Sequence, residues 1–237
     1  MSQTEIHPVQ LPLGVSLSDA YTFANYFSAS NEFVTRSLHD FLNLPDFQFV
    51  YLWGAHNSGK THLLQACSAQ ASTNGESACY IPCRQFDEHE HRVLDGLDNL
   101  NLVCIDDVDS IASCKDWEQK LFSLFNMLRD RKARLIVSAS GNIAECGFDM
   151  PDLISRMQWG LSLRLLLLDD EQKAQALKYR CEGRGIDINI DVIHWLIKHI
   201  SRDMASLYEF IEAAIEQAIM QQRRLTIPFI KSLDIFH

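Results

Sequence analysis

The sequence predicts an α/β domain, in which helices cover both faces of a parallel sheet, followed by a small all-helical domain. Between residues 16 and 165, short apolar runs alternate with stretches of helical periodicity, as in parallel sheets. These runs are apolar on both faces, which is typical of strands buried between two layers of helices. From residue 166 onward, only helical spacing remains.

Five apolar runs are the expected strands. Phe49–Trp53 is the clearest, because it ends directly at Gly54. The others are 78–81, 102–105, 135–137 and 161–165. The chain thereby divides into an extended arm (1–15), a sheet domain (16–165) and a helical domain (166–237).

Helices in the last part are expected to begin at Asp169 or Asp170, at Val192 and at Asp203, and a short one at Thr226. The helix from Asp203 carries an apolar stripe at helical spacing. Its members are Met204, Leu207, Tyr208, Ile211, Ala214, Ile215 and Ile219.

Composition excludes several classes of protein. The 237 residues carry a net charge of −10, which argues against a protein that coats DNA unaided, because phosphate neutralisation requires a basic face. The longest apolar run, 161–168, is interrupted by Ser162 and Arg164 and falls far short of the roughly 20 residues that cross a bilayer. Seven cysteines without a CxxC pair are typical of reduced cytosolic thiols. We therefore expect a cytoplasmic protein.

A phosphate-binding motif follows the first strand. Residues 54–61, GAHNSGKT, match GxxxxGK[ST] between a strand and a helix. Such a loop points amide hydrogens inward, and the helix adds its positive end, so the site suits polyphosphate. Lys60 is expected to reach the β- and γ-phosphates, and the Thr61 hydroxyl to coordinate Mg²⁺. The expected nucleotide-binding residues are Gly54, Asn57, Ser58, Gly59, Lys60, Thr61 and His62.

Two aspartates end the third expected strand, in LVCIDD (102–107). In open α/β sheets, ligands bind at the carboxyl ends of the strands. Asp106 is therefore the candidate Mg²⁺ ligand, and Asp107 could orient or deprotonate an attacking water. The alternative is a pair of acids that cap the next helix.

Arg156 lies in PDLISRM (151–157), a helical segment before the last strand. A guanidinium exposed there could contact the phosphates of a nucleotide bound to a neighbouring subunit, because its planar N–H groups spread positive charge over several phosphate oxygens. Spacing alone favours a surface salt bridge instead.

Together, GAHNSGKT, LVCIDDVD, PDLISRMQWG and the trailing helical domain resemble the AAA+ ATPases, most closely the DnaA clade. YTFANYF (21–27) is similar to the DnaA segment beside the adenine, and LTIPF (225–229) matches near the end. The resemblance covers essentially the whole chain. It implies an AAA+ P-loop core with a five-stranded parallel sheet, a helical lid, bound ADP or ATP with Mg²⁺, and association into homo-oligomers.

By this resemblance, Arg156 would be an arginine finger inserted into ATP-bound DnaA. Ser138 and Ser140 would occupy the sensor 1 position, where a polar side chain can hold the hydrolytic water. At sensor 2 the clade has an arginine, but the alignment places Ala205 there, with Arg202 the nearest basic residue. We therefore expect weak or no intrinsic ATP hydrolysis, while diphosphate binding is retained.

The arm contains Gln10-Leu11-Pro12-Leu13, which resembles the clamp-binding peptide of DnaA-related regulators. A glutamine followed by alternating leucines suits an extended peptide in a hydrophobic groove, here that of the DNA polymerase III sliding clamp (beta subunit). Gln10, Leu11 and Leu13 are the expected contacts. The alternative is an arm that binds nothing.

The resemblance implies a regulator of chromosomal replication initiation. It would bind the DNA-loaded clamp, reach DNA only indirectly at the replisome, and stimulate hydrolysis of DnaA-bound ATP to prevent re-initiation.

One rival function is that of a DNA-acting AAA+ ATPase or helicase loader; the net charge and Ala205 both argue against it. The other is a P-loop kinase, which needs more lid arginines than Arg180, Arg184 and Arg202. The nucleotide retained, the oligomeric state and the clamp affinity stay open.

Overall fold

The computed structural model describes residues 21–44, 46–200 and 203–233. Its contacts divide the chain into two compact units. The first is built mainly from Phe33–Ala55 and Gly59–Leu165, and the second from Leu166 onward together with Ala24–Glu32 and His56–Ser58. The expected arm, with Gln10, Leu11 and Leu13, lies outside the described residues.

The first unit contains a parallel five-stranded sheet in the order β2-β3-β4-β1-β5. The strands are β1 Phe49–Trp53, β2 Ala78–Pro82, β3 Leu102–Asp106, β4 Arg134–Ala139 and β5 Leu161–Arg164. All five predicted strands are therefore confirmed. β4 begins one residue earlier than predicted, because the Arg134 side chain is buried and bonds to the Leu42 carbonyl oxygen and the Glu76 carboxylate.

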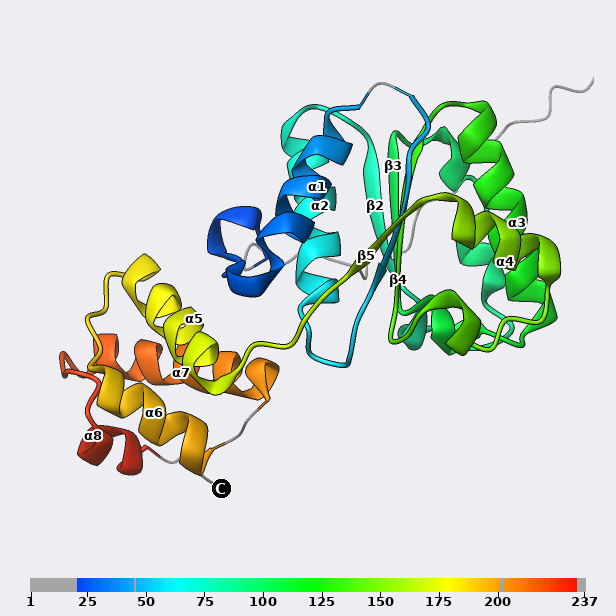
Figure 1. The fold of residues 1–237 in the computed structure, drawn as a ribbon. Helices are drawn as coiled ribbons and strands as arrows, with labels where there is room; N and C mark the ends of the chain where they lie inside the picture. The colour runs from blue at the N-terminus through cyan, green and yellow to red at the C-terminus, as the bar shows by residue number, and fades with distance from the viewer. Residues whose placement is uncertain (1–20, 45, 201–202, 234–237) are drawn as a thin grey trace, which may run out of the picture. The chain divides into compact units, whose positions relative to one another are not determined.

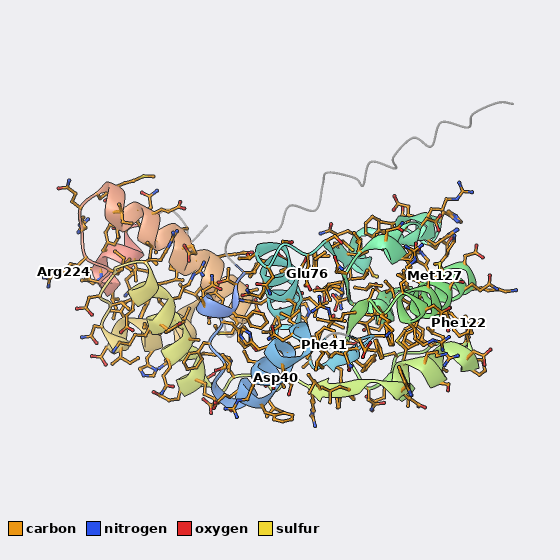
Figure 2. The ribbon with its side chains drawn as sticks, turned by 90° about the horizontal axis from the view of Figure 1, so that it is seen from above. Asp40, Phe41, Glu76, Phe122, Met127 and Arg224 are labelled. Atoms are coloured by element: carbon orange, nitrogen blue, oxygen red, sulfur yellow. The ribbon has the colours of Figure 1, made fainter. Side chains whose placement is uncertain are left out.

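Helices cover both faces of this sheet. α1 (Glu32–Leu42) and α2 (Lys60–Thr73) lie on one face, and α3 (Lys115–Asp130) and α4 (Pro151–Trp159) on the other (Figure 1). In Figure 2, Asp40 and Phe41 of α1 accordingly lie on the opposite side of the core from Phe122 and Met127 of α3. Because helices cover both faces, every residue of β3 and β4 is buried.

Short 3₁₀ helices connect these elements. They are η1 Phe23–Asn25, η2 Ala29–Asn31, η3 Cys83–Gln85, η4 His91–Leu94, η5 Leu97–Asn99, η6 Val108–Ile111 and η7 Ile143–Glu145. Two of them, η3 after β2 and η6 after β3, pack against each other. They therefore bring together two segments that follow neighbouring strands.

Gly160 turns the chain from α4 into β5. A Cβ atom at this position would lie 2.4 Å from the Phe49 carbonyl oxygen and 2.2 Å from the Phe49 ring, distances that real Cβ atoms do not show. Only glycine therefore allows the backbone to pass this close to β1, the strand with which β5 pairs.

The second unit is helical, with α5 Asp170–Gly183, α6 Ile190–His199, α7 Met204–Met220 and α8 Ile227–Lys231. At the N-cap of each of these helices, a side chain accepts a hydrogen bond from a backbone N–H of the first turn; the N-cap residues are Asp169, Asn189, Asp203 and Thr226. The predicted stripe on α7 is confirmed for its centre, where Leu207, Ile211 and Ile215 are buried. Ile219 was wrongly placed on it: its side chain is 58% exposed, and Ala218 is buried instead.

No helix within the described ranges has the length and apolar character needed to cross a membrane.

Candidate functional site

The loop from Gly54 to Gly59 joins β1 to α2. Asn57 (φ 62°) and Gly59 (φ 97°) both have left-handed backbone conformations, which glycine adopts freely and asparagine tolerates best among other residues. Among the described residues, no side chain caps the first turn of α2. The amides of this 14-residue helix and the helix dipole therefore favour an anion at its start.

Lys60 opens α2 and lies along the loop. Its side chain is buried, and Nζ donates to the carbonyl oxygens of Gly54 (3.0 Å) and Ala55 (3.2 Å). The Ser58 hydroxyl is buried without a hydrogen-bond partner among the described residues. A lysine, an orphaned hydroxyl and a row of amides together fit a ligand rich in negatively charged oxygens.

Asp106, the last residue of β3, accepts hydrogen bonds from three hydroxyl groups. Its Oδ2 accepts from Thr61 Oγ1 (2.6 Å) and from the Tyr80 hydroxyl (2.8 Å), and its Oδ1 accepts from Ser138. The carboxylate is only 2% exposed, and these bonds offset its burial. The predicted pair of Thr61 and Asp106, 45 residues apart, is thus brought together. A hydroxyl and a carboxylate are hard oxygen ligands, so the residues present fit Mg²⁺.

Tyr80 is a site residue that sequence reasoning missed. Burial, and then the Asp106 carboxylate, raise the pKa of Tyr80 well above its usual range, so its hydroxyl stays a proton donor to Asp106. Its strand, β2, pairs with β3 and ends at the same edge, with Pro82 opposite Asp106. The rule that ligands bind at the carboxyl ends of strands could have identified β2, but not Tyr80 itself.

Asp107 follows immediately but has different partners. Its backbone is left-handed (φ 53°), its N–H donates to Ser138 Oγ (2.9 Å), and its Oδ2 lies 2.7 Å from Arg84 Nε. Burial, and then Asp106, raise the pKa of Asp107, although Arg84 and Lys60 act in the opposite direction. Asp107 precedes η6, but its side chain makes no cap bond there. The capping alternative is therefore wrong for this residue.

The two sensor 1 candidates have separate roles. Ser138, near the end of β4, is fully buried between Asp106 and Asp107. Ser140 donates instead to the Asp109 carboxylate in η6. The structure thus brings Ser138, but not Ser140, into contact with the two aspartates.

The start of the described chain lies beside α2. His62 Nε2 is 2.9 Å from the Thr22 carbonyl oxygen, and the rings of Tyr21 and His62 meet edge to face at 5.1 Å. The segment identified by its resemblance to the adenine-side segment of DnaA therefore begins next to the phosphate-binding loop.

Arg156 lies in the last turn of α4, on the opposite face of the sheet from α2 (Figure 1). Its side chain is half-buried and has no ion pair or hydrogen bond with any described residue. The salt bridge that spacing favoured is therefore absent from the described part of the chain. The two residues that precede α4 are held by the buried Glu118, which accepts hydrogen bonds from the amides of Asp149 (3.0 Å) and Met150 (2.7 Å).

Ala205, the residue aligned with sensor 2, is the second residue of α7. Arg202 lies outside the described residues.

Solved structures support the fold. Domain III of DnaA from Thermotoga maritima matches with a TM-score of 0.76 at 19% identity, over 91% of this chain and 96% of that chain. A DnaA bound to AMPPCP and single-stranded DNA matches at 0.73 and 19% identity, over 88% of this chain and 70% of that one. The RuvB Holliday junction branch migration motor of Thermotoga maritima matches at 0.61 and 16%, over 89% and 72%.

Family models assign both units. The model of the bacterial DnaA ATPase domain matches residues 17–164, more than half of the chain, and that of the Hda lid domain matches residues 170–233. The AAA+ core and the helical lid expected from the motifs are both confirmed. The chain therefore belongs to the bacterial DnaA ATPase family of AAA+ proteins and carries a lid domain of the Hda type.

Proposed function

We propose that this chain is a nucleotide-binding regulator of chromosomal replication initiation, which binds the DNA-loaded sliding clamp and stimulates hydrolysis of the ATP bound to DnaA. The observation that carries the proposal is Arg156, a guanidinium without an acidic partner among the described residues, on a DnaA-type core. Stimulation of this kind would prevent re-initiation.

The nucleotide is ADP or ATP. Lys60 and the amides that open α2 bind its phosphates, while Thr61 and Asp106 hold Mg²⁺. Nucleotide analogues are bound by DnaA itself, including that of Aquifex aeolicus, which supports this assignment. Bound Mg²⁺ supplies charge neutralisation at the phosphates. Because Ala205 has no charge, we expect the chain to hydrolyse ATP weakly or not at all.

In the complex with DnaA, the Arg156 guanidinium stabilises charge that develops on the phosphate oxygens of DnaA's ATP. A finger supplied in trans can increase the rate by about 10³–10⁵. Copies of this chain would associate through the same surface.

The clamp supplies the route to DNA. Gln10, Leu11 and Leu13 support this step only through their resemblance to clamp-binding peptides. A net charge of −10 is consistent with a protein that reaches DNA indirectly, at the replisome in the cytoplasm.

The test is release of phosphate from ATP-bound DnaA mixed with clamp, DNA and this chain. Arg156→Ala should reduce the stimulation at least about 100-fold. Arg224→Ala is a matched control, since Arg224 is an exposed arginine of the second unit (Figure 2). Equal loss in both variants, or no loss in Arg156→Ala, would show that Arg156 is not the finger.

Clamp binding is tested separately. Replacing Gln10, Leu11 and Leu13 by alanine should abolish both retention on the DNA-loaded clamp and stimulation, while nucleotide binding is unchanged. Unchanged retention would refute the role of the arm.

A DNA-acting ATPase or helicase loader is the main rival, and the likeness to RuvB shows only the shared fold. Binding of DNA without clamp, tighter than about micromolar at physiological salt, would favour it. Phosphate transfer to a nucleoside monophosphate would favour the P-loop kinase.

A further inference from the structure

Glu118 is a buried carboxylate that the proposed function does not use. It lies in the first turn of α3 and is only 2% exposed. Its Oε1 accepts from the amides of Ser113 (2.9 Å) and Asp149 (3.0 Å), and its Oε2 accepts from the amide of Met150 (2.7 Å). These charge-assisted bonds offset the burial of the carboxylate, and they join the start of α3 to the segment that leads into α4.

Ser113, between η6 and α3, adds a second link between the same two segments. Its Oγ donates to the Gly147 carbonyl oxygen (2.8 Å). The backbone of Ser113 is left-handed (φ 62°), a conformation that costs a serine about 1–2 kcal/mol. The bonds made by Ser113 and Glu118 offset this strain. We call these two residues the α4 anchor.

Apolar packing alone does not fix the position of α4 along its own axis. Leu153 and Met157 are buried and attach one side of the helix to the core. Such burial is not directional and tolerates small sliding and rotation, whereas hydrogen bonds are directional. The bonds that Glu118 accepts therefore set where α4 begins. Arg156 lies less than two turns after Met150, so a displacement at the start of the helix is carried to its guanidinium.

We propose that Glu118 and Ser113 are positioning residues, which hold α4 and thereby place Arg156 for contact with the phosphates of the ATP on DnaA. The inference rests on the proposed function of Arg156. Rates depend steeply on placement, and a misplacement of about 1 Å can cost about 100-fold. Loss of the α4 anchor should therefore lower the stimulated rate much more than the affinity for DnaA.

The test follows phosphate release from ATP-bound DnaA, with DNA-loaded clamp and increasing amounts of the full chain. Glu118→Gln keeps the shape of the side chain but places an N–H group against a backbone N–H. The maximal stimulated rate should fall by about 10- to 100-fold. The concentration that gives half-maximal stimulation should change less than about threefold, because the surface that meets DnaA is unaltered.

Ser113→Gly is a milder variant of the same anchor. Glycine adopts the left-handed backbone freely, so this chain should fold normally and lose only the bond to the Gly147 carbonyl oxygen. Its maximal rate should fall by about two- to fivefold. This variant decides the question if Glu118→Gln does not fold.

Two further measurements separate positioning from a general loss of stability. In Glu118→Gln, hydrogen exchange should become faster at the amides of Asp149 and Met150 and along α4, but not in α7. Leu38→Ala removes a fully buried side chain of α1, on the opposite face of the sheet from α4 (Figure 1). It should lower the free energy of unfolding by about 2–5 kcal/mol and leave the maximal rate unchanged.

Arg156→Ala, measured in parallel, distinguishes the two proposals. Full stimulation by Arg156→Ala would refute the finger, and the positioning role with it. Loss in Arg156→Ala, with an unchanged maximal rate in both anchor variants, would overturn the positioning role alone. Glu118→Gln combined with Arg156→Ala should cause no further loss, because the anchor acts through Arg156. A further loss, or an equal loss in Leu38→Ala, would also overturn the positioning role.

Discussion

The candidate site in the sheet unit and the helix N-caps in the helical unit differ in how far along the chain their side-chain hydrogen bonds reach. In the sheet unit, Asp106 gathers hydroxyls from α2, β2 and β4, contributed by residues up to 45 positions away. In the helical unit, the cap residues Asp169 and Thr226 accept hydrogen bonds from backbone amides three positions along the chain. Long-range polar contacts therefore build a site, and short-range ones begin helices. Substitutions in the first unit should alter ligand binding, and those in the second should alter stability.

The largest effect should come from the core of the helical unit. Ile211→Ala removes a fully buried side chain of α7 and should destabilise this unit by about 2–5 kcal/mol. Chemical denaturation followed by circular dichroism measures it. Ile219→Ala, on the same helix at an exposed position, should change stability by less than about 0.5 kcal/mol. Equal losses of stability in the two variants would contradict the burial of the apolar stripe as the source of α7's packing energy.

Next in size is the lysine of the phosphate-binding loop. Lys60→Ala should weaken nucleotide binding by about 10- to 100-fold, because a charge-assisted bond to phosphate is lost. Titration with a fluorescent nucleotide measures the affinity. Lys198→Ala removes an exposed lysine of α6 and should have no effect. Retained affinity in Lys60→Ala would refute the phosphate site.

Tyr80→Phe tests the network around Asp106. The lost hydroxyl leaves a buried carboxylate with one partner fewer, so Mg²⁺-dependent nucleotide binding should weaken about tenfold. Binding without Mg²⁺ should be unchanged, which isothermal titration in EDTA can check. Tyr51→Phe, which removes the hydroxyl of another buried tyrosine, bonded to the Gly141 carbonyl oxygen, should not alter either affinity. A loss that is independent of Mg²⁺ would assign Tyr80 to packing alone.

The smallest effect should be that of a single cap. Asp169→Ala removes the acceptor of the Gln172 amide and should lower stability by about 1 kcal/mol without changing nucleotide affinity. Asp169→Asn preserves a capping acceptor and should lose much less. A change of affinity in Asp169→Ala would contradict the division of roles between the units.

Local pattern predicted most elements, because strands and helices have distinct apolar periods. The phosphate-binding loop was also readable, since its glycines, Lys60 and Thr61 are consecutive. Arg134 was not predicted to belong to a strand, because a charged residue is rarely buried. Its guanidinium is accommodated by the Leu42 carbonyl oxygen and the Glu76 carboxylate, both of which lie far away in sequence. Ile219 was predicted to be buried because helical spacing shows which side of a helix a residue lies on. It does not show how far along the helix the packing partners extend.

By itself, then, the sequence determined the strand, loop and helix of the GxxxxGK[ST] motif, and the identity of the two aspartates. These features depend on contiguous residues and on backbone geometry. Only the tertiary structure decided that Tyr80 and Ser138 hold Asp106 while Arg84 holds Asp107. The reason is physical: the edge of a parallel sheet assembles side chains from separate strands, and their spacing along the chain carries no record of which will meet.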